Sequence, residues 1–305
     1  MSASDFVRIF EVGPRDGLQN EKRVVSFEDR LFLIQGLVQA GLQEIEVGAF
    51  VREDRVPQMA KSEEVLHALR DGRVAFGSAH DWSLVPNTRG MQNAVAAGAK
   101  RVAVFTAATE GFNQKNIGMT IEQSLAEISR VVEIAKAHGI AVRGYVSTAF
   151  GCPYEGKVPA EKPLKVISAL SSLGIEEISV GDTIGVATPR GVEEVIRPAI
   201  SEHGPSRIAV HFHDTRGTAL ANTLRSLEMG IRIVDSSAGG LGGCPFAPGA
   251  TGNLATEDLV YMLDGMGMKT GVDLSALCQT SLEFAKRIQR PLTSRYLAAY
   301  AASCS

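Results

Sequence analysis

The most constraining feature of the sequence is a regular alternation of two kinds of segment from end to end. Short runs rich in apolar and β-branched residues, typical of buried strands, alternate with longer segments of helical periodicity. Strands are expected at 7–12, at 44–49, within 73–85, and at 101–107, 140–147, 176–182, 207–213 and 232–238. Helices are expected near 26–40, 61–70, 88–98, 120–138, 159–173, 189–203, 217–229 and 255–267. Strands joined by helical crossovers pair in parallel.

Such a series of units forms either a closed barrel or an open, doubly wound sheet. The even spacing and the lack of an early G-x-G-x-x-G or Walker motif favour closure. A barrel of this kind commonly needs about 250 residues, and no linker interrupts the 305 residues of the chain. We therefore expect one α/β domain over 1–305, a (β/α)8 TIM barrel. Additional C-terminal helices from about residue 275 would cover the barrel or pack against another subunit.

The charge balance argues against several partners. The 31 basic and 34 acidic residues give a net charge of -3, and no block of like charge could follow a phosphate backbone. Nucleic acid is therefore not expected, and no uncharged apolar run reaches the roughly 18 residues of a membrane span. Exposed barrel helices often mediate assembly, so we expect a homo-oligomer, most simply a dimer.

The cysteines and the N-terminal segment bear on the compartment. Cys152, Cys244, Cys278 and Cys304 form no C-x-x-C pair or regular framework, a pattern that fits reduced thiols better than disulfides. No export signal precedes the first expected strand. We therefore expect a cytoplasmic protein, with Cys278 a buried inert residue and Cys304 an incidental surface thiol.

Polar residues stand at the carboxyl ends of several expected strands. The active sites of such barrels lie at those ends, so the residues would converge at one mouth. They are Arg15 and Asp16 after the first strand, Glu46 in the second, Asp182 at the end of the sixth, and His211 and His213 on the seventh.

His211 and His213 are two positions apart, so both imidazoles point to the same side of their strand, as a shared metal requires. The alternative is a pair of hydrogen-bonded core histidines. With Asp16 they make a nitrogen and oxygen site without thiolate, which suits magnesium, manganese, iron or zinc. Asn253 could add an amide oxygen to a hard metal, or could simply cap the following helix.

Segment 239–253 contains six glycines and two prolines, which predicts a long loop. Long loops in compact domains are usually functional, and glycines permit hinge motion and close approach to a ligand. We interpret 239–253 as a mobile active-site lid. Cys244 at its centre could then exchange a proton with a carbanion or enolate, unless it is a buried inert cysteine.

Three further residues have an ordinary and a functional interpretation. Arg15 could form a plain surface ion pair, but a guanidinium inside the mouth suits the stabilisation of an oxyanion. Glu46 on the next strand would then orient Arg15 or a metal ligand. Asp182 is a candidate proton carrier, or else a cap on the turn that follows it.

Five blocks resemble 3-hydroxy-3-methylglutaryl-CoA lyases in content and order, and the match covers most of 7–270. They are EVGPRDGLQNEK (11–22), RGYVSTAFGCPYEG (143–156), GDTIG (181–185), HFHDT (211–215) and GGLGGCPFAPGATGNLATEDLVYML (239–263). The resemblance implies a metal-dependent barrel lyase that converts this thioester to acetyl-CoA and acetoacetate, as in leucine catabolism and ketone-body metabolism. The family prefers Mg²⁺ or Mn²⁺. Its metal ligands fall on Asp16, His211, His213 and Asn253, its arginine on Arg15 and its loop cysteine on Cys244, while Glu46 and Asp182 match motif positions.

The resemblance implies a retro-Claisen cleavage. The metal would lower the pKa of the tertiary hydroxyl, and His211 or Asp182 would take its proton. Bond cleavage would leave the enolate of acetyl-CoA, with Arg15 stabilising its oxygen and Cys244 protonating its carbon.

The chain departs from the family at 49–59 and 77–87, where His80, Asp81 and Trp82 lie close to a strand end. We expect both segments to face the acyl pocket, so a related 3-hydroxy-3-carboxymethylacyl-CoA is an alternative substrate. A second alternative is a condensing acyltransferase of the isopropylmalate or homocitrate synthase type. Such enzymes share the Arg-Asp and HxH elements with this chain but lack the Gly-Gly-Cys-Pro loop. Metal-dependent hydrolases carry HxH on the first strand, and a non-catalytic thioester-binding barrel is the remaining alternative.

Overall fold

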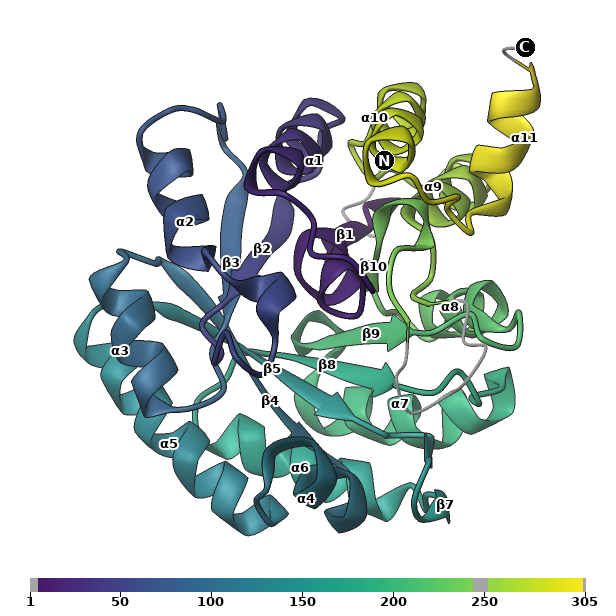
Figure 1. The fold of residues 1–305 in the computed structure, drawn as a ribbon. Coiled ribbons are helices and arrows are strands. Elements are labelled where there is room, and N and C mark those ends of the chain that lie inside the picture. The colour runs from purple at the N-terminus through teal and green to yellow at the C-terminus, as the bar shows by residue number, and fades with distance from the viewer. Residues whose placement is uncertain (1–4, 244–251, 304–305) are drawn as a thin grey trace.

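The computed structural model describes residues 5–243 and 252–303. Within them, eight parallel strands close into a barrel in the order β1-β10-β9-β8-β5-β4-β3-β2 (Figure 1). The barrel strands are Arg8–Glu11 (β1), Glu44–Ala49 (β2), His80–Leu84 (β3), Arg101–Ala107 (β4), Ala141–Ser147 (β5), Glu177–Asp182 (β8), Ile208–Phe212 (β9) and Ile233–Ser236 (β10). The predicted (β/α)8 TIM barrel is confirmed.

Helices surround the barrel, and those expected from the sequence begin and end within two residues of their predicted bounds. The described helices are Phe27–Gln39 (α1), Ser62–Arg70 (α2), Thr88–Ala96 (α3), Glu110–Ile117 (α4), Ile121–Ala137 (α5), Glu161–Ser172 (α6), Pro189–His203 (α7), Ala219–Glu228 (α8), Thr256–Gly265 (α9), Leu274–Ile288 (α10) and Arg295–Ser303 (α11). No helix in the described ranges combines the length and apolar character needed to cross a bilayer.

Helix α4 was not predicted, nor was the small antiparallel pair of Gly151–Cys152 (β6) with Gly156–Lys157 (β7). Helix α4 buries only Phe112 and Asn113, so its eight residues carry too little apolar periodicity to be recognised.

Local signals in the sequence explain where the longer helices begin. Thr188 caps α7 by accepting a hydrogen bond from the backbone N–H of Gly191, and Pro189 occupies the first turn, where its missing N–H costs nothing. At the start of α5, Thr120 and Gln123 form a reciprocal capping box.

The interior of the barrel is unusually polar. Phe10 and Trp82 pack there with ring centroids 5.4 Å apart, and the guanidinium of Arg143 lies 3.8 Å from the centroid of the Phe10 ring. The indole N–H of Trp82 donates to Glu44 Oε2 at 2.6 Å. Branched aliphatic residues usually fill this space in such barrels. Here, ion pairs and aromatic rings replace part of that filling.

The C-terminal tail is helical, as expected, and its first helix packs on the barrel. Helix α10 lies against α1 and α9, while α11 contacts α9 and α10 (Figure 1). Leu277, Cys278 and Phe284 on α10 are fully buried. The approach to α1 is close, since a Cβ added at Gly36 would lie 2.3 Å from the Thr280 side chain.

Candidate metal centre and active site

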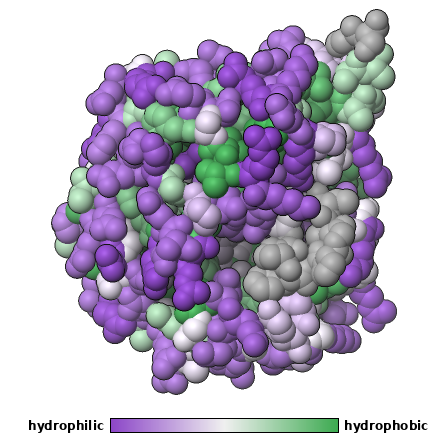
Figure 2. Space-filling view, viewed as in Figure 1, coloured by the Kyte–Doolittle hydropathy of each residue, from purple (hydrophilic) through white to green (hydrophobic). Residues whose placement is uncertain are grey.

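A cavity of about 1400 Å³ opens at the carboxyl ends of the strands. Its wall includes Arg15, Asp16, Tyr145, His211 and His213. Hydrophilic side chains predominate on the face of the molecule drawn in Figure 2. The structure therefore brings four of the expected site residues to one wall, at the end of the barrel where such enzymes carry their active sites.

Asp16, His211 and His213 form a group of potential metal ligands. One ligand atom from each residue lies within 4.8 Å of the others. Asn253 joins them, because its Nδ2 donates to Asp16 Oδ2 at 2.8 Å. Among the described residues, Asn253 Oδ1 and His213 Nδ1 are buried without a hydrogen-bond partner. A buried polar atom without a partner costs about 1–3 kcal/mol. A cation bound by this group would give such atoms a partner, so the residues fit a metal site better than a pair of hydrogen-bonded core histidines.

The fold explains why Asn253 reaches this group. The backbone of 252–254 runs along the end of β9, where Asp214 N donates to Gly252 O at 3.0 Å and Leu254 N donates to Phe212 O at 3.0 Å. Asn253 therefore lies opposite His213. The helix-cap interpretation of Asn253 is wrong, because the N-cap of α9 is Ala255.

Asp16 is placed by a single wide turn, Gly13–Gly17 (η2), in which Gly17 N donates to Val12 O at 3.1 Å. Turns of this π type occur often at functional sites. A Cβ at Gly17 would lie 2.9 Å from the Leu241 side chain. The glycine therefore allows the loop after β10 to pack against the turn that carries Asp16.

The electrostatic environment favours the protonation states that metal ligands need. Burial alone would raise the pKa of Asp16, but Arg15 and the two histidines lower it to about 2. Burial lowers the pKa of His213 to about 4, and the neighbouring His211 acts in the same direction. At neutral pH Asp16 is therefore ionised and His213 neutral, as ligation requires.

Arg15 is 5% exposed and is fixed between two carboxylates. Its Nε donates to Glu46 Oε2 at 2.6 Å and its Nη1 donates to Asp16 Oδ1 at 2.7 Å. Tyr145 donates its hydroxyl to the same Glu46 oxygen at 3.3 Å. Glu46 thus contacts Arg15 as expected, while burial raises the pKa of Glu46 itself.

The carboxylate of Asp182 is fully buried and caps a turn. Its Oδ1 accepts from Val186 N at 3.0 Å and its Oδ2 from Ala187 N at 2.8 Å. Burial raises its pKa despite these bonds. The neighbouring residues Gly181 and Thr183 line the cavity. The cap interpretation of Asp182 is therefore observed, next to the cavity wall.

The described part of the expected lid comprises 239–243 and 252–253, and Cys244 lies outside the described residues. Two buried carboxylates hold the base of this loop. Glu11 Oε1 accepts from Ala238 N at 2.9 Å, and Glu257 accepts from Gly239 N at 2.7 Å. Burial raises the pKa of each carboxylate to about 7.

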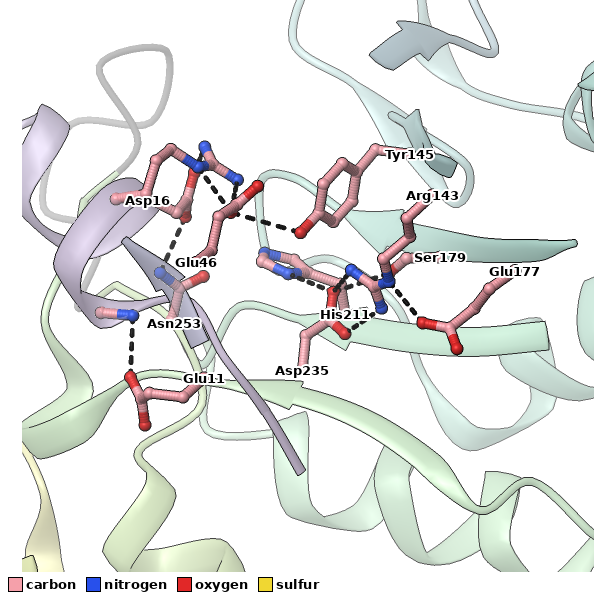
Figure 3. A network of polar contacts seen from close by, with 12 residues as sticks. Glu11, Asp16, Glu46, Arg143, Tyr145, Glu177, Ser179, His211, Asp235 and Asn253 are labelled. Carbon is pink, nitrogen blue, oxygen red and sulfur yellow. Dashed lines mark hydrogen bonds and ion pairs between the residues drawn. The ribbon is translucent and has the colours of Figure 1, made fainter. Parts of the chain in front are cut away.

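A second layer of polar residues, which was not predicted, lies behind the proposed metal ligands. Asp235, on β10, accepts from Arg143 and Ser179, and its Oδ2 lies 3.2 Å from His211 Nδ1 (Figure 3). The sequence does contain a signal for this layer. Charged or polar residues occur inside strands that are buried on both faces, and such residues are expected to point into the barrel.

The two segments that depart from the family behave differently. Ala49, Arg52 and Arg55 line the cavity, as expected for 49–59. The expectation for 77–87 is only partly correct. His80 is the first residue of β3 and Trp82 lies in its middle, and both bond Glu44, the first residue of β2, at the opposite end of the barrel from the cavity. The cavity wall begins at Leu84.

Comparison with known proteins gives a consistent result. A family model described as HMGL-like matches residues 6–283. The rat protein named 3-hydroxy-3-methylglutaryl-CoA lyase, cytoplasmic, is 47% identical over 291 residues, which cover 95% of this chain and 84% of the relative. The bovine mitochondrial hydroxymethylglutaryl-CoA lyase is 49% identical over 289 residues, covering 95% of this chain and 88% of its own.

Solved structures agree with the sequence relatives. The hydroxymethylglutaryl-CoA lyase of Pseudomonas aeruginosa superposes with a TM-score of 0.93 at 44% identity, covering 98% of both chains. An HMG-CoA lyase from Acinetobacter baumannii, in complex with coenzyme A and 3-methylmalate, superposes with a TM-score of 0.92 at 36% identity, covering 98% of this chain and 96% of its own.

Proposed function

Because this chain belongs to the HMGL-like family, we propose that it is a carbon–carbon lyase that cleaves 3-hydroxy-3-methylglutaryl-CoA to acetyl-CoA and acetoacetate. One observation supports this most directly. One ligand atom each of Asp16, His211 and His213 lies within 4.8 Å of the others at the wall of a cavity that Arg15 also lines.

We propose that Asp16, His211, His213 and Asn253 hold a divalent metal, Mg²⁺ or Mn²⁺. The buried, unpartnered Asn253 Oδ1 supports this ligand set, because a hard cation binds amide and carboxylate oxygens readily. When bound, the cation supplies Lewis acidity, which lowers the pKa of a substrate hydroxyl.

The chain's own groups would then direct the cleavage. Arg15 is proposed to stabilise the thioester oxygen as it becomes an enolate oxygen, since Glu46 and Asp16 hold the guanidinium in one orientation. The bond between the carbinol carbon and the thioester's α-carbon breaks. Its electron pair goes to the α-carbon, and the carbinol carbon becomes the ketone of acetoacetate.

A proton must leave the hydroxyl and another must reach the α-carbon. His211 is a poor proton acceptor once one ring nitrogen binds the metal and the other donates to Asp235. We therefore favour Asp182 as the proton carrier, because it lies between Gly181 and Thr183 of the cavity wall and burial raises the pKa of its carboxyl. We keep Cys244 as the proposed donor to the α-carbon. Gly243, the residue before it, lines the cavity.

A product assay tests this function. Purified protein is stripped of metal and incubated with 3-hydroxy-3-methylglutaryl-CoA and related 3-hydroxy-3-carboxymethylacyl-CoA thioesters, with and without Mg²⁺ or Mn²⁺, and released acetyl-CoA is quantified. We expect metal-dependent release. The panel is informative because Ala49, Arg52 and Arg55 line the cavity where the chain departs from its relatives. Absence of cleavage of every thioester would refute the lyase assignment.

We propose a cytoplasmic location, although relatives carry both cytoplasmic and mitochondrial names. The two described free cysteines, Cys152 and Cys278, are buried, as is common in a reducing compartment. Cell fractionation with an antibody against the chain tests the location.

We also propose a homodimer. Tyr261 in helix α9 and Met266 directly after it expose 59% and 45% of their surface, which leaves apolar area available for a partner. Light scattering after size exclusion gives the mass in solution, and a monomer mass would contradict the proposal.

A further inference from the structure

The two ring nitrogens of His211 lie in different surroundings. Nδ1 is 3.2 Å from Asp235 Oδ2, and the side chain of His211 is 12% exposed while that of Asp235 is fully buried. The His211 ring lies beside the His213 ring, with centroids 5.2 Å apart. Because Nδ1 is committed to Asp235, Nε2 is the nitrogen left to act as a ligand in the Asp16, His211 and His213 group.

Asp235 is itself held from several sides. Arg143 bonds both of its carboxylate oxygens, with Nη1 3.2 Å from Oδ2, and Ser179 Oγ donates to Oδ2 at 2.7 Å (Figure 3). Asp235 also lies directly opposite His211 in the pairing of β10 with β9. Because Arg143 and Ser179 both donate to it, the Asp235 carboxyl group faces His211 Nδ1 in a fixed position.

Glu177 belongs to the same network and provides a matched control for Asp235. The Nε of Arg143 donates to Glu177 Oε1 at 2.5 Å, on the side away from Asp235. Glu177 also pairs with Arg8 but bonds no proposed metal ligand in the described structure. Replacing either carboxylate disturbs the ion pairs of the buried Arg143, but only the loss of Asp235 removes the partner of His211.

We propose that Asp235 is a positioning residue that holds His211 as the Nδ1–H tautomer, so that its Nε2 lone pair faces the metal. Carboxylate partners of this kind fix the tautomer and ring orientation of a ligating histidine and increase its basicity. The proposal rests on the proposed metal site, and in it Asp235 contacts neither metal nor substrate.

The test begins with the metal-free, wild-type protein labelled with ¹⁵N-histidine. Long-range ¹H–¹⁵N spectra under alkaline conditions, where the ring is neutral, report which ring nitrogen carries the proton, and a His211→Gln variant assigns the signal. The same measurement is made on Asp235→Asn and Glu177→Gln. Mn²⁺ dissociation constants are then measured for all three proteins by electron paramagnetic resonance of free Mn²⁺.

We expect wild type and Glu177→Gln to carry the proton on Nδ1 and to bind Mn²⁺ within about threefold of each other, while Asp235→Asn loses the tautomer preference and binds about 10- to 100-fold more weakly. A proton on Nε2 in the wild-type protein would overturn the proposal, as would equal weakening in both variants or no weakening in Asp235→Asn. If Asp235→Asn fails to fold, the wild-type spectrum alone decides. If the wild-type protein binds no Mn²⁺, the proposed lyase site fails, whereas the spectrum still tests the Asp235–His211 pair.

Discussion

Glu11 should make the stability of this protein depend on pH in a measurable way. Glu11→Gln should remove the Glu11 part of that dependence and leave the part that comes from Glu257, whose pKa burial also raises to about 7. The Glu11 carboxylate is fully buried at the end of β1, where its Oε1 accepts from Gly13 N at 2.7 Å and Ala238 N at 2.9 Å. Its Oε2 accepts from Thr256 Oγ1 at 2.6 Å. Burial dominates these bonds and raises the pKa from 4.5 to about 7.

The sign of the effect follows from proton uptake. Between pH 4.5 and about 7 the unfolded chain has an ionised Glu11 while the folded protein still binds its proton. The folded state therefore holds more protons, and its stability falls as pH rises through this window. One proton corresponds to about 1.36 kcal/mol per pH unit, so Glu11 should reduce the free energy of unfolding by about 3 kcal/mol across the window.

Glutamine suits this test because it can reproduce the protonated carboxyl. Its Oε1 can accept from the same two backbone N–H groups, and its amide can donate to Thr256 Oγ1, whose hydroxyl can then donate to Ser236 Oγ at 2.8 Å. Relative to the wild type, Glu11→Gln should therefore gain about 3 kcal/mol between pH 4.5 and pH 8.

The assay is urea unfolding of metal-free protein at several pH values. Glu64→Gln, on the exposed side of α2, is the control for the loss of one acidic group. A Glu11→Gln protein whose stability follows the same pH dependence as the wild type would refute the reasoning.

Three other changes test the site. Arg15→Gln should lower kcat about 100- to 1000-fold and leave Mn²⁺ affinity within about threefold, because Arg15 is assigned to the enolate rather than the metal; an equal loss in steady-state kinetics and Mn²⁺ binding would contradict that role. Asp16→Asn should weaken both turnover and Mn²⁺ binding, and a variant with unchanged metal affinity would exclude Asp16 as a ligand. Gly242→Ala should weaken Mn²⁺ binding, since the added Cβ would lie 2.7 Å from Asn253 Nδ2 at a φ of +125°. Gly243→Ala is its control, because its added Cβ meets no described atom within 4 Å, and equal affinities in the two variants would contradict the packing argument.

Much of the fold could be predicted because local signals agree with the overall pattern. Helix α7 was predicted with its observed bounds, since a capping threonine and a proline precede an amphipathic run that ends at Gly204. Helix α4 could not be predicted in this way. It lies in a connection between β4 and α5, and its position depends on tertiary contacts such as that of Gly111 N with Glu155 Oε1 at 2.7 Å.

In the candidate site, too, the residues with a local sequence signal could be predicted, and those whose position depends on tertiary structure could not. His211, His213 and Asp16 could be recognised because strand ends in a barrel converge and residues two apart share a side. The contact of Asn253 with Asp16 spans 237 positions of the sequence and depends on how the chain returns along β9. No local pattern distinguishes that return from a helix cap.

The residues that the sequence analysis missed share one property. Arg143 and Tyr145 stand two positions apart on β5, Glu177 and Ser179 stand two apart on β8, and Asp235 faces His211 across neighbouring strands. Helices surround the barrel (Figure 1), so a charged side chain buried within a strand is expected to find its partners in the interior. Side chains two positions apart on a strand point to the same side, so the pairs on β5 and β8 could have been assigned to the barrel interior from the sequence. The proposed metal centre consequently lies against a charged interior layer, in which His211 contacts Asp235 and Asp235 pairs with Arg143.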